Sequence, residues 1–140
     1  MTAPPLLPVT DDPDTGEFFA AAGRGALAVC ECAGCGRSLH MPRRWCHHCR
    51  AGEVRWREVA PAGTVYSYCV VAHQVHPDYP VPYTVLLIEL DEAPGVRLVG
   101  HVDGRPGLAI GDPVRARFAP AGDGGLPVWE LAQPPDHRQA

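Results

Sequence analysis

Two Cys-x-x-Cys pairs constrain this chain more than any other feature of its sequence. Cys32 and Cys35 form the first pair, Cys46 and Cys49 form the second, and ten residues lie between the pairs. Each pair can bend the backbone around one ion, so two pairs supply the four soft ligands of a closed tetrahedral site. We therefore predict a zinc ribbon over residues 30–52, with a structural Zn²⁺ at its centre. Rubredoxin-type iron uses the same spacing and is the less favoured metal.

The other cysteines and the nearby histidines are not needed as ligands. Cys30 stands two residues before the first pair, and Cys69 falls in a strand pattern where we expect a small, buried apolar side chain. His47 and His48 lie inside the second pair and could replace a thiolate, although four cysteines are already present. Disulfides or free thiols are the alternatives to a metal. Because the N-terminus shows no secretory pattern, we expect reduced cysteines and a cytoplasmic location.

Length and charge limit the classes of function. The 140 residues suffice for one domain with a small appendage, and no apolar run reaches the roughly 20 residues that span a bilayer. The formal net charge is −4, so the chain lacks the basic surface of a general nucleic-acid binder. Residues 1–13 and 132–140 are expected to form a flexible arm and tail.

Residues 14–29 are expected to form a short helix and its approach to the ribbon. Asp14 followed by Glu17 resembles a capping box, and it predicts a helix over residues 15–22. The helix carries Phe18 and Phe19, which are adjacent and cannot both be buried against one surface. Core packing of these rings is the favoured interpretation. The alternative is that one ring packs inward while the other meets a partner protein.

The sequence after the ribbon predicts a mainly β structure. Short strands are expected over residues 53–59, 63–72, 82–90, 97–102, 114–118 and 128–131, with turns at 93–95, 103–107 and 120–125. Five or six such strands within residues 53–131 indicate a small closed barrel, because closure removes exposed strand edges. Residues 73–81 form a loop that is too long for a tight hairpin, and loops of this kind often carry function.

Taken together, these motifs resemble the acyl-CoA-associated zinc-ribbon/OB-fold family, formerly a domain-of-unknown-function family. The matching residues are Phe18, Phe19 and Gly25; Cys32, Cys35, Gly36, Cys46 and Cys49; residues 63–67; Pro82 and Tyr83; residues 89–92; Arg97; and Gly111 with Val114. The resemblance implies an N-terminal helix, a rubredoxin-like zinc ribbon and an OB-fold barrel. Arg50 departs from the glycine that the family usually has after the second pair, which puts the local turn in question.

The resemblance also implies a function. Members of the family accompany thiolase-superfamily thiolases or aldolases in steroid or fatty acyl-CoA metabolism, and others associate with hotdog-fold enoyl-CoA hydratases. The chain is therefore expected to be a noncatalytic accessory subunit that supports acyl-CoA passage and binds an enzyme on a separate polypeptide. The sequence itself offers no nucleophile elbow and no phosphate-binding glycine loop, and His73 and His76 have no third metal ligand nearby.

Two surfaces are candidates for these contacts. The expected partner-facing residues are Phe18, Phe19, His73, His76, Tyr79, Pro82 and Tyr83. Arg43, Arg44 and Trp45 could lie beside the CoA path, since guanidinium groups match phosphates and an indole can stack on adenine. The alternative, which we favour, is a solvated hairpin tip with Trp45 packed on the barrel. Acyl-CoA binding is accordingly expected only within the complex.

The rival hypothesis is single-stranded nucleic-acid binding, a common role of OB-folds. Tyr66 and Tyr68 are two residues apart in one predicted strand, so they would share a face as base-stacking platforms. The alternative is that both rings belong to the barrel core or to a protein interface. Nucleic acid is therefore the less favoured partner, because no basic groove accompanies the tyrosines.

Overall fold

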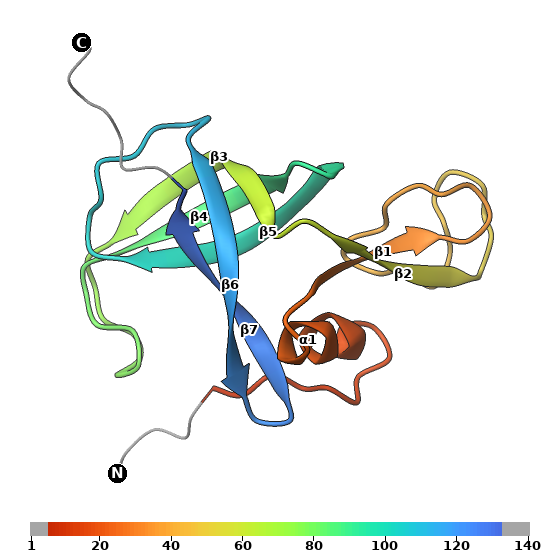
Figure 1. Cartoon of the computed structure of the whole chain (residues 1–140), viewed down its shortest axis with the longest axis horizontal. Coiled ribbons are helices and arrows are strands. Elements are labelled where there is room, and N and C mark those ends of the chain that lie inside the picture. The colour runs from red at the N-terminus through yellow and green to blue at the C-terminus, as the bar shows by residue number, and fades with distance from the viewer. Residues whose placement is uncertain (1–5, 133–140) are drawn as a thin grey trace.

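The computed structural model describes residues 6–132, which form one short helix and seven strands (Figure 1). The elements are α1 (Gly16–Gly23), β1 (Leu27–Cys32), β2 (Val54–Val59), β3 (Ala62–Val71), β4 (Tyr83–Leu90), β5 (Ala93–Asp103), β6 (Pro113–Ala121) and β7 (Gly124–Leu131). The expected arm and tail lie partly in residues 1–5 and 133–140, outside the described residues. Helix α1 is too short to span a membrane, and the described part of the chain contains no other helix.

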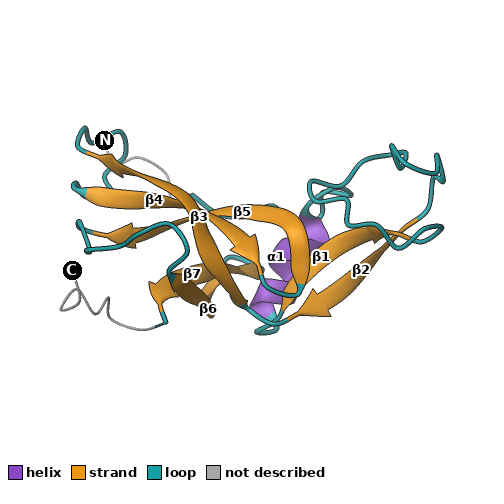
Figure 2. Cartoon of the chain, turned by 90° about the horizontal axis from the view of Figure 1, so that it is seen from above, coloured by secondary structure: helices purple, strands orange, loops and turns teal. Residues whose placement is uncertain are grey.

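The strands form two separate sheets at opposite ends of the molecule. β1 and β2 make a two-stranded antiparallel sheet that carries the cysteine loops, and the other five strands are ordered β5-β4-β3-β6-β7 (Figures 1 and 2). The two edge strands, β5 and β7, contact each other without forming a ladder, so the five-stranded sheet curls into a barrel that is not fully closed by hydrogen bonds. A curled five-stranded sheet of this order is consistent with an OB-fold, and it confirms the mainly β prediction.

The barrel core is built by strict alternation along β4. Thr84, Leu86, Ile88 and Leu90 are buried, whereas the residues between them are half-exposed on the outer face. Apolar side chains from all of the remaining strands of this sheet, β3, β5, β6 and β7, join this core, including Trp129 from β7. Burial of so much apolar area is the main stabilising contribution in a domain of this size.

The strand over residues 54–59 belongs with the ribbon and not with the barrel sheet. It had been expected as the first barrel strand, but β2 pairs with β1 from Leu27↔Val59 to Cys32↔Val54. All six residues of β1 are buried, so its sequence shows no alternation and was interpreted only as an apolar approach. The expected turn at residues 93–95 is also wrong in part, since β5 already begins at Ala93.

Helix α1 forms within one residue of its predicted ends, but its start is stabilised differently. Thr15 is the N-cap and makes no capping hydrogen bond to the helix, so the expected Asp14–Glu17 capping box is absent. Asp12 instead orders the turn before the helix, because its carboxylate accepts hydrogen bonds from the Asp14 amide at 2.9 Å and the Thr15 hydroxyl at 2.7 Å. Glu17 pairs with Arg24 at the helix end.

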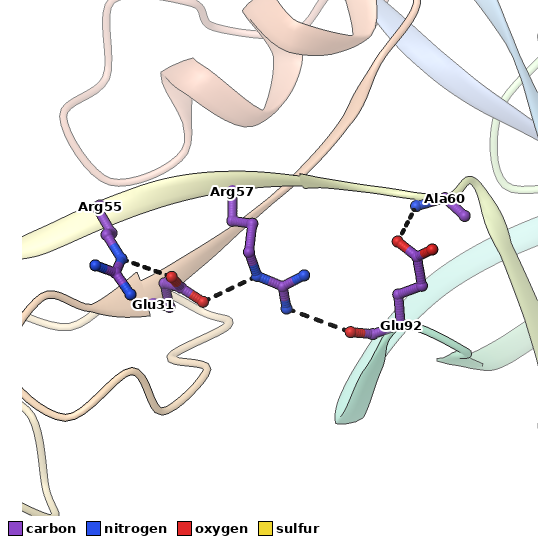
Figure 3. A network of polar contacts seen from close by, with 5 residues as sticks. All are labelled: Glu31, Arg55, Arg57, Ala60 and Glu92. Atoms are coloured by element: carbon purple, nitrogen blue, oxygen red, sulfur yellow. Dashed lines mark hydrogen bonds and ion pairs between the residues drawn. The ribbon is translucent and has the colours of Figure 1, made fainter.

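One buried carboxylate links the ribbon sheet to the barrel (Figure 3). Glu31 on β1 is 6% exposed and accepts hydrogen bonds from Arg55 at 2.6 Å and Arg57 at 3.0 Å, both on β2. Arg57 also donates to the Glu92 carbonyl at 3.3 Å, and the Glu92 carboxylate accepts from the Ala60 amide at 2.7 Å. The hydrogen bond from Arg55, with help from Arg57, lowers the pKa of Glu31 below its usual 4.5.

We predict that Glu31→Gln lowers the free energy of unfolding by about 1–2 kcal/mol near neutral pH, because the charge-assisted hydrogen bonds are lost and both arginines are partly solvated. The wild-type pKa is depressed in the fold, so this contribution is complete above pH 4.5 and is lost as pH falls through the folded pKa. Urea unfolding of both proteins between about pH 7 and pH 3 measures it. A stability difference that stays constant over this range would contradict the assignment.

Candidate metal centre and apolar groove

The four cysteines of the two pairs converge at one end of the β1–β2 sheet. Their sulfur atoms all lie within 4.8 Å of one another, with Cys32 and Cys49 separated by 3.5 Å and Cys35 and Cys46 by 3.7 Å. A tetrahedral ion with metal–sulfur bonds of about 2.3 Å places its sulfurs about 3.8 Å apart, which the two short separations approach. A disulfide would need about 2.05 Å. The cluster therefore fits one four-coordinate metal ion, as the sequence predicted.

The two halves of the centre have the same backbone turn. The Gly36 amide donates to the Cys32 carbonyl at 2.8 Å, and the Arg50 amide donates to the Cys46 carbonyl at 2.9 Å. Both residues are left-handed, with φ of 72° at Gly36 and 65° at Arg50. Arg50 thus adopts a left-handed backbone conformation that has a lower free-energy cost for glycine, and the turn forms without a glycine at this position.

Backbone amides favour the thiolate forms of Cys32 and Cys46, whereas the effect of the Ala51 amide on Cys49 is outweighed by the neighbouring Cys32 thiol and by burial, so the pKa of Cys49 is raised to about 11. The amides of Cys49 and His48 lower the pKa of Cys46 to about 6, and the His48 amide lies 3.4 Å from the Cys46 sulfur. The Cys35 amide likewise lowers the pKa of Cys32. Burial has the opposite effect on Cys30, whose pKa is raised. Cys30 is buried beneath the ribbon and lies outside the four-sulfur cluster.

We predict about one metal ion per reduced chain, lost in Cys46→Ser, because a ribbon with three thiolates no longer closes the tetrahedron. Elemental analysis of unchelated protein measures the metal, and circular dichroism shows whether the barrel, which has its own apolar core, stays folded. Cys30→Ser and Cys69→Ser are the matched controls and should retain the metal. Metal-free wild-type protein would overturn the site.

A second feature is an apolar groove of about 500 Å³ between the helix, the ribbon and the barrel. Its walls come from α1, from residues 40–42 of the ribbon, from residues 97–101 of β5 and from residues 126–129 of β7. These segments are far apart in the sequence and meet only in the folded chain. Among the residues that line the groove, the ionisable ones are His40, Arg97, His101 and Tyr79, and none carries a carboxylate.

Two buried nitrogen atoms of groove residues have no hydrogen-bond partner within the described structure: Nδ1 of His40 and Nε1 of Trp129. The Trp129 indole packs so closely on Gly100 that a β-carbon at Gly100 would lie 2.3 Å from it. Burial lowers the pKa of His40, which favours its neutral form. The part of the groove formed by His40, Gly100 and Trp129 is therefore closely packed and carries no formal charge.

The groove brings together parts of both segments that the sequence indicated as partner-facing. Phe18, Phe19 and Tyr79 line it, and Phe18 also packs against the barrel core. Tyr79 lies 5.0 Å from His101 and 5.8 Å from Tyr83 between ring centroids, so the loop is held against β5 and β4. His76 contacts Tyr79, whereas His73 and Pro82 are exposed and do not line the groove.

The candidate CoA contacts are exposed at the ribbon tip. Arg43 and Arg44 are both exposed, and the Arg44 guanidinium carbon lies 5.9 Å from the centre of the Trp45 ring. The expectation that Trp45 packs on the barrel is wrong, because its side chain is 60% exposed and rests on Gly52 of the ribbon. The expectation that Cys69 is buried is also wrong, since Cys69 is exposed on β3. All residues from Tyr66 to Val70 are exposed, so this part of β3 is not covered by another layer on either face.

The tyrosines that suggested base stacking do not share a face. A β-bulge interrupts β3 between Val65 and Ser67, so the alternation of side chains is shifted beyond it. Tyr68 then lies opposite Leu86, a core residue, while Tyr66 stacks under Arg97 with its ring centre 3.8 Å from the guanidinium carbon. The Arg97 guanidinium therefore covers one face of the Tyr66 ring, although Tyr66 and Tyr68 remain 46% and 43% exposed.

Sequence reasoning missed most of the groove. The sequence assigns residues 40–42 to the ribbon hairpin and residues 97–101 to an ordinary strand, and it places only residues 128 and 129 of the β7 wall in a strand. One signal in the sequence points to the groove. Val99 occupies an outward position in the alternation of β5, and its side chain is 73% exposed in the structure. A large apolar side chain at an outward strand position can mark an interaction site.

Comparison with known proteins shows what the chain is similar to. Residues 56–119 match the family model described as the C-terminal OB-fold domain of ChsH2. The chain is 39% identical over 126 residues to a probable enoyl-CoA hydratase alpha subunit from Thermomonospora curvata. It is 40% identical over 70 residues to the 3-oxo-4,17-pregnadiene-20-carboxyl-CoA hydratase alpha subunit of Mycobacterium tuberculosis. These alignments include 86% and 49% of this chain but span only 38% and 22% of the two relatives.

Two solved structures are also similar. One is described as the Ltp2-ChsH2(DUF35) aldolase, with a TM-score of 0.77 and 35% identity over 87% of this chain and 97% of the matched chain. The other is a DUF35 protein of unknown function from Sulfolobus solfataricus, with a TM-score of 0.54 and 20% identity over 76% of this chain and 77% of that chain. At 20% identity the second likeness is one of fold alone.

Proposed function

The chain belongs to the DUF35 family that includes the DUF35 domain of ChsH2, and from this premise we propose that it is a noncatalytic accessory subunit of an acyl-CoA-metabolising enzyme complex. The proposal rests on one observation. The structure of this chain is similar to that of the Ltp2-ChsH2(DUF35) aldolase over 97% of the matched chain. The proposed partner is a thiolase-superfamily aldolase or thiolase. A hotdog-fold enoyl-CoA hydratase is a further partner, in keeping with the hydratase subunits among the relatives.

The proposed metal is Zn²⁺ with a structural role. Cys32, Cys35, Cys46 and Cys49 would hold it, and four thiolates leave no open position for water or substrate. The ion supplies fixed tetrahedral geometry that keeps the ribbon folded. Zinc is proposed over iron because it is the usual structural ion of closed four-cysteine ribbons. Thiolate ligands require reduced cysteines, which is consistent with a location in the cytoplasm.

The noncatalytic role is supported by the chemistry of the groove. Its ionisable residues include a histidine whose pKa is lowered by burial, and no carboxylate lies among the lining residues to orient that histidine as a base. The groove instead combines aromatic and aliphatic side chains from three parts of the fold. Apolar surfaces of this kind are typical of sites where another protein packs.

The test is complex formation with candidate enzymes. The metal-loaded chain is coexpressed with the thiolase-superfamily and hydratase enzymes of its own organism and, separately, with the Ltp2 component of the related aldolase. We predict a stoichiometric complex with one of them, and no hydratase, thiolase or aldolase activity from the chain alone. Phe19→Ala should weaken the complex without unfolding the chain, whereas Phe18→Ala should also lower stability because Phe18 packs on the core. Activity of the purified chain would contradict the noncatalytic role.

We also predict that the isolated chain binds acyl-CoA weakly or not at all, and that Arg43, Arg44 and Trp45 contribute to binding only within the complex. The two arginines are solvated at the ribbon tip, where a phosphate contact made by side chains alone is weak. Calorimetry with CoA esters compares the chain, the enzyme and the complex. An Arg43→Ala, Arg44→Ala double variant should reduce binding in the complex. Tight binding by the chain alone would make it a CoA-binding protein in its own right.

A further inference from the structure

We propose that the apolar groove is the docking site for one segment of the partner enzyme, an apolar helix or loop that carries a carboxylate beside its apolar anchor. This inference rests on the proposed function and deepens it, because it assigns the face of the chain that meets the enzyme and the chemistry of the segment that enters. The walls of the groove come from the helix, the ribbon and the barrel together, so the site exists only when all three are folded.

The groove continues across β5 onto the outer face of the sheet. Val99, Gly100, His101 and Tyr79 line both the main groove and an adjoining hollow, which Tyr83 and Val85 also line. Val99 stands at this junction with 73% of its surface exposed, and Met41 on the opposite wall is 59% exposed. Such an elongated apolar surface fits an extended or helical segment better than a compact small molecule.

The positive charge of Arg97 indicates which polar group of the partner segment lies beside its apolar anchor. Arg97 is the permanently charged residue among those lining the groove, and it is braced by the Tyr66 ring at 3.8 Å and by an Nε hydrogen bond of 3.1 Å to Glu89. Its two terminal nitrogens make no hydrogen bond within the described part of the chain, so they can form a forked pair with a carboxylate. Glu89 pairs with the Nε side of Arg97 and does not line the groove, so the two terminal nitrogens are the part of the guanidinium that a partner carboxylate would meet.

Strands β5 and β7 are in close contact beneath the groove. Trp129 is held against Gly100, and any side chain at that position would collide with the indole, so β5 and β7 are fixed in their present contact. Phe18 and Phe19 are likewise fixed edge to face, with ring centroids 5.3 Å apart. A rigid groove loses little conformational entropy on binding, which favours docking of a preformed segment.

The experiment uses the full chain and the enzyme retained in the complex-formation test above. Val99→Arg is compared with Ile110→Arg, a matched control because Ile110 is 70% exposed and does not line the groove. Val99→Arg should weaken the complex by about tenfold or more, and Ile110→Arg by less than about twofold, since a charge at the centre of an apolar contact cannot be desolvated cheaply. Neither change should alter the unfolding midpoint.

Arg97→Gln tests the carboxylate. It should weaken the complex by about tenfold and flatten the decrease in affinity with added salt, because a charge pair is removed. An unchanged affinity for both Val99→Arg and Arg97→Gln would overturn the groove while leaving the accessory role intact. If the wild-type chain binds none of the enzymes, the result contradicts the proposed accessory function itself, and not only the docking site. Concentration-dependent self-association, or tight small-molecule binding, that Val99→Arg abolishes would assign the groove to another occupant and overturn the proposal.

Discussion

The ribbon is joined to the barrel by the apolar packing of Leu27, Val29 and Val59 in the barrel core, and the buried carboxylate of Glu31 adds a polar network beside them. Its two oxygens hold Arg55 and Arg57 on the neighbouring strand, and Arg57 extends the contact to the carbonyl of Glu92 at the start of β5 (Figure 3). A buried carboxylate is costly unless it is paired, so this arrangement favours the observed pairing of β1 with β2, while the hydrogen bond from Arg57 to Glu92 connects that sheet to the barrel. The groove lies between the ribbon and the barrel, and its shape follows from the way these two parts are joined.

The loop between the two cysteine pairs connects the metal centre to the groove. The loop between the cysteine pairs supplies residues 40–42 to the groove wall, and Leu39 anchors it through a 2.8 Å hydrogen bond from its amide to the Cys30 carbonyl. A metal that fixes Cys35 and Cys46 therefore also fixes both ends of this loop. A structural ion in this position would order one wall of the groove without any chemistry of its own.

The outer face of the barrel is shaped by the bulge in β3. An added residue between Val65 and Ser67 turns Tyr66 outward against Arg97 and leaves Tyr68 opposite the core residue Leu86. The arginine is thereby oriented by an aromatic ring and a carboxylate at the edge of the groove. The same bulge separates Tyr66 from Tyr68, so the two rings no longer form the shared stacking face that suggests a nucleic-acid surface.

The sequence by itself determined the features that depend on local spacing. The convergence of the four cysteines follows from two turns that each need only a few residues, and helix α1 and the strands of the barrel follow from composition and alternation. It did not reveal β1, because a strand buried on both faces does not alternate, nor the exposure of Trp45 and Cys69. Only the tertiary structure decided the groove, since Phe19, Met41, Val99 and Trp129 lie on four segments that no local pattern relates. Side chains from distant segments become neighbours only through the packing of the whole chain, and packing is not encoded at any one position.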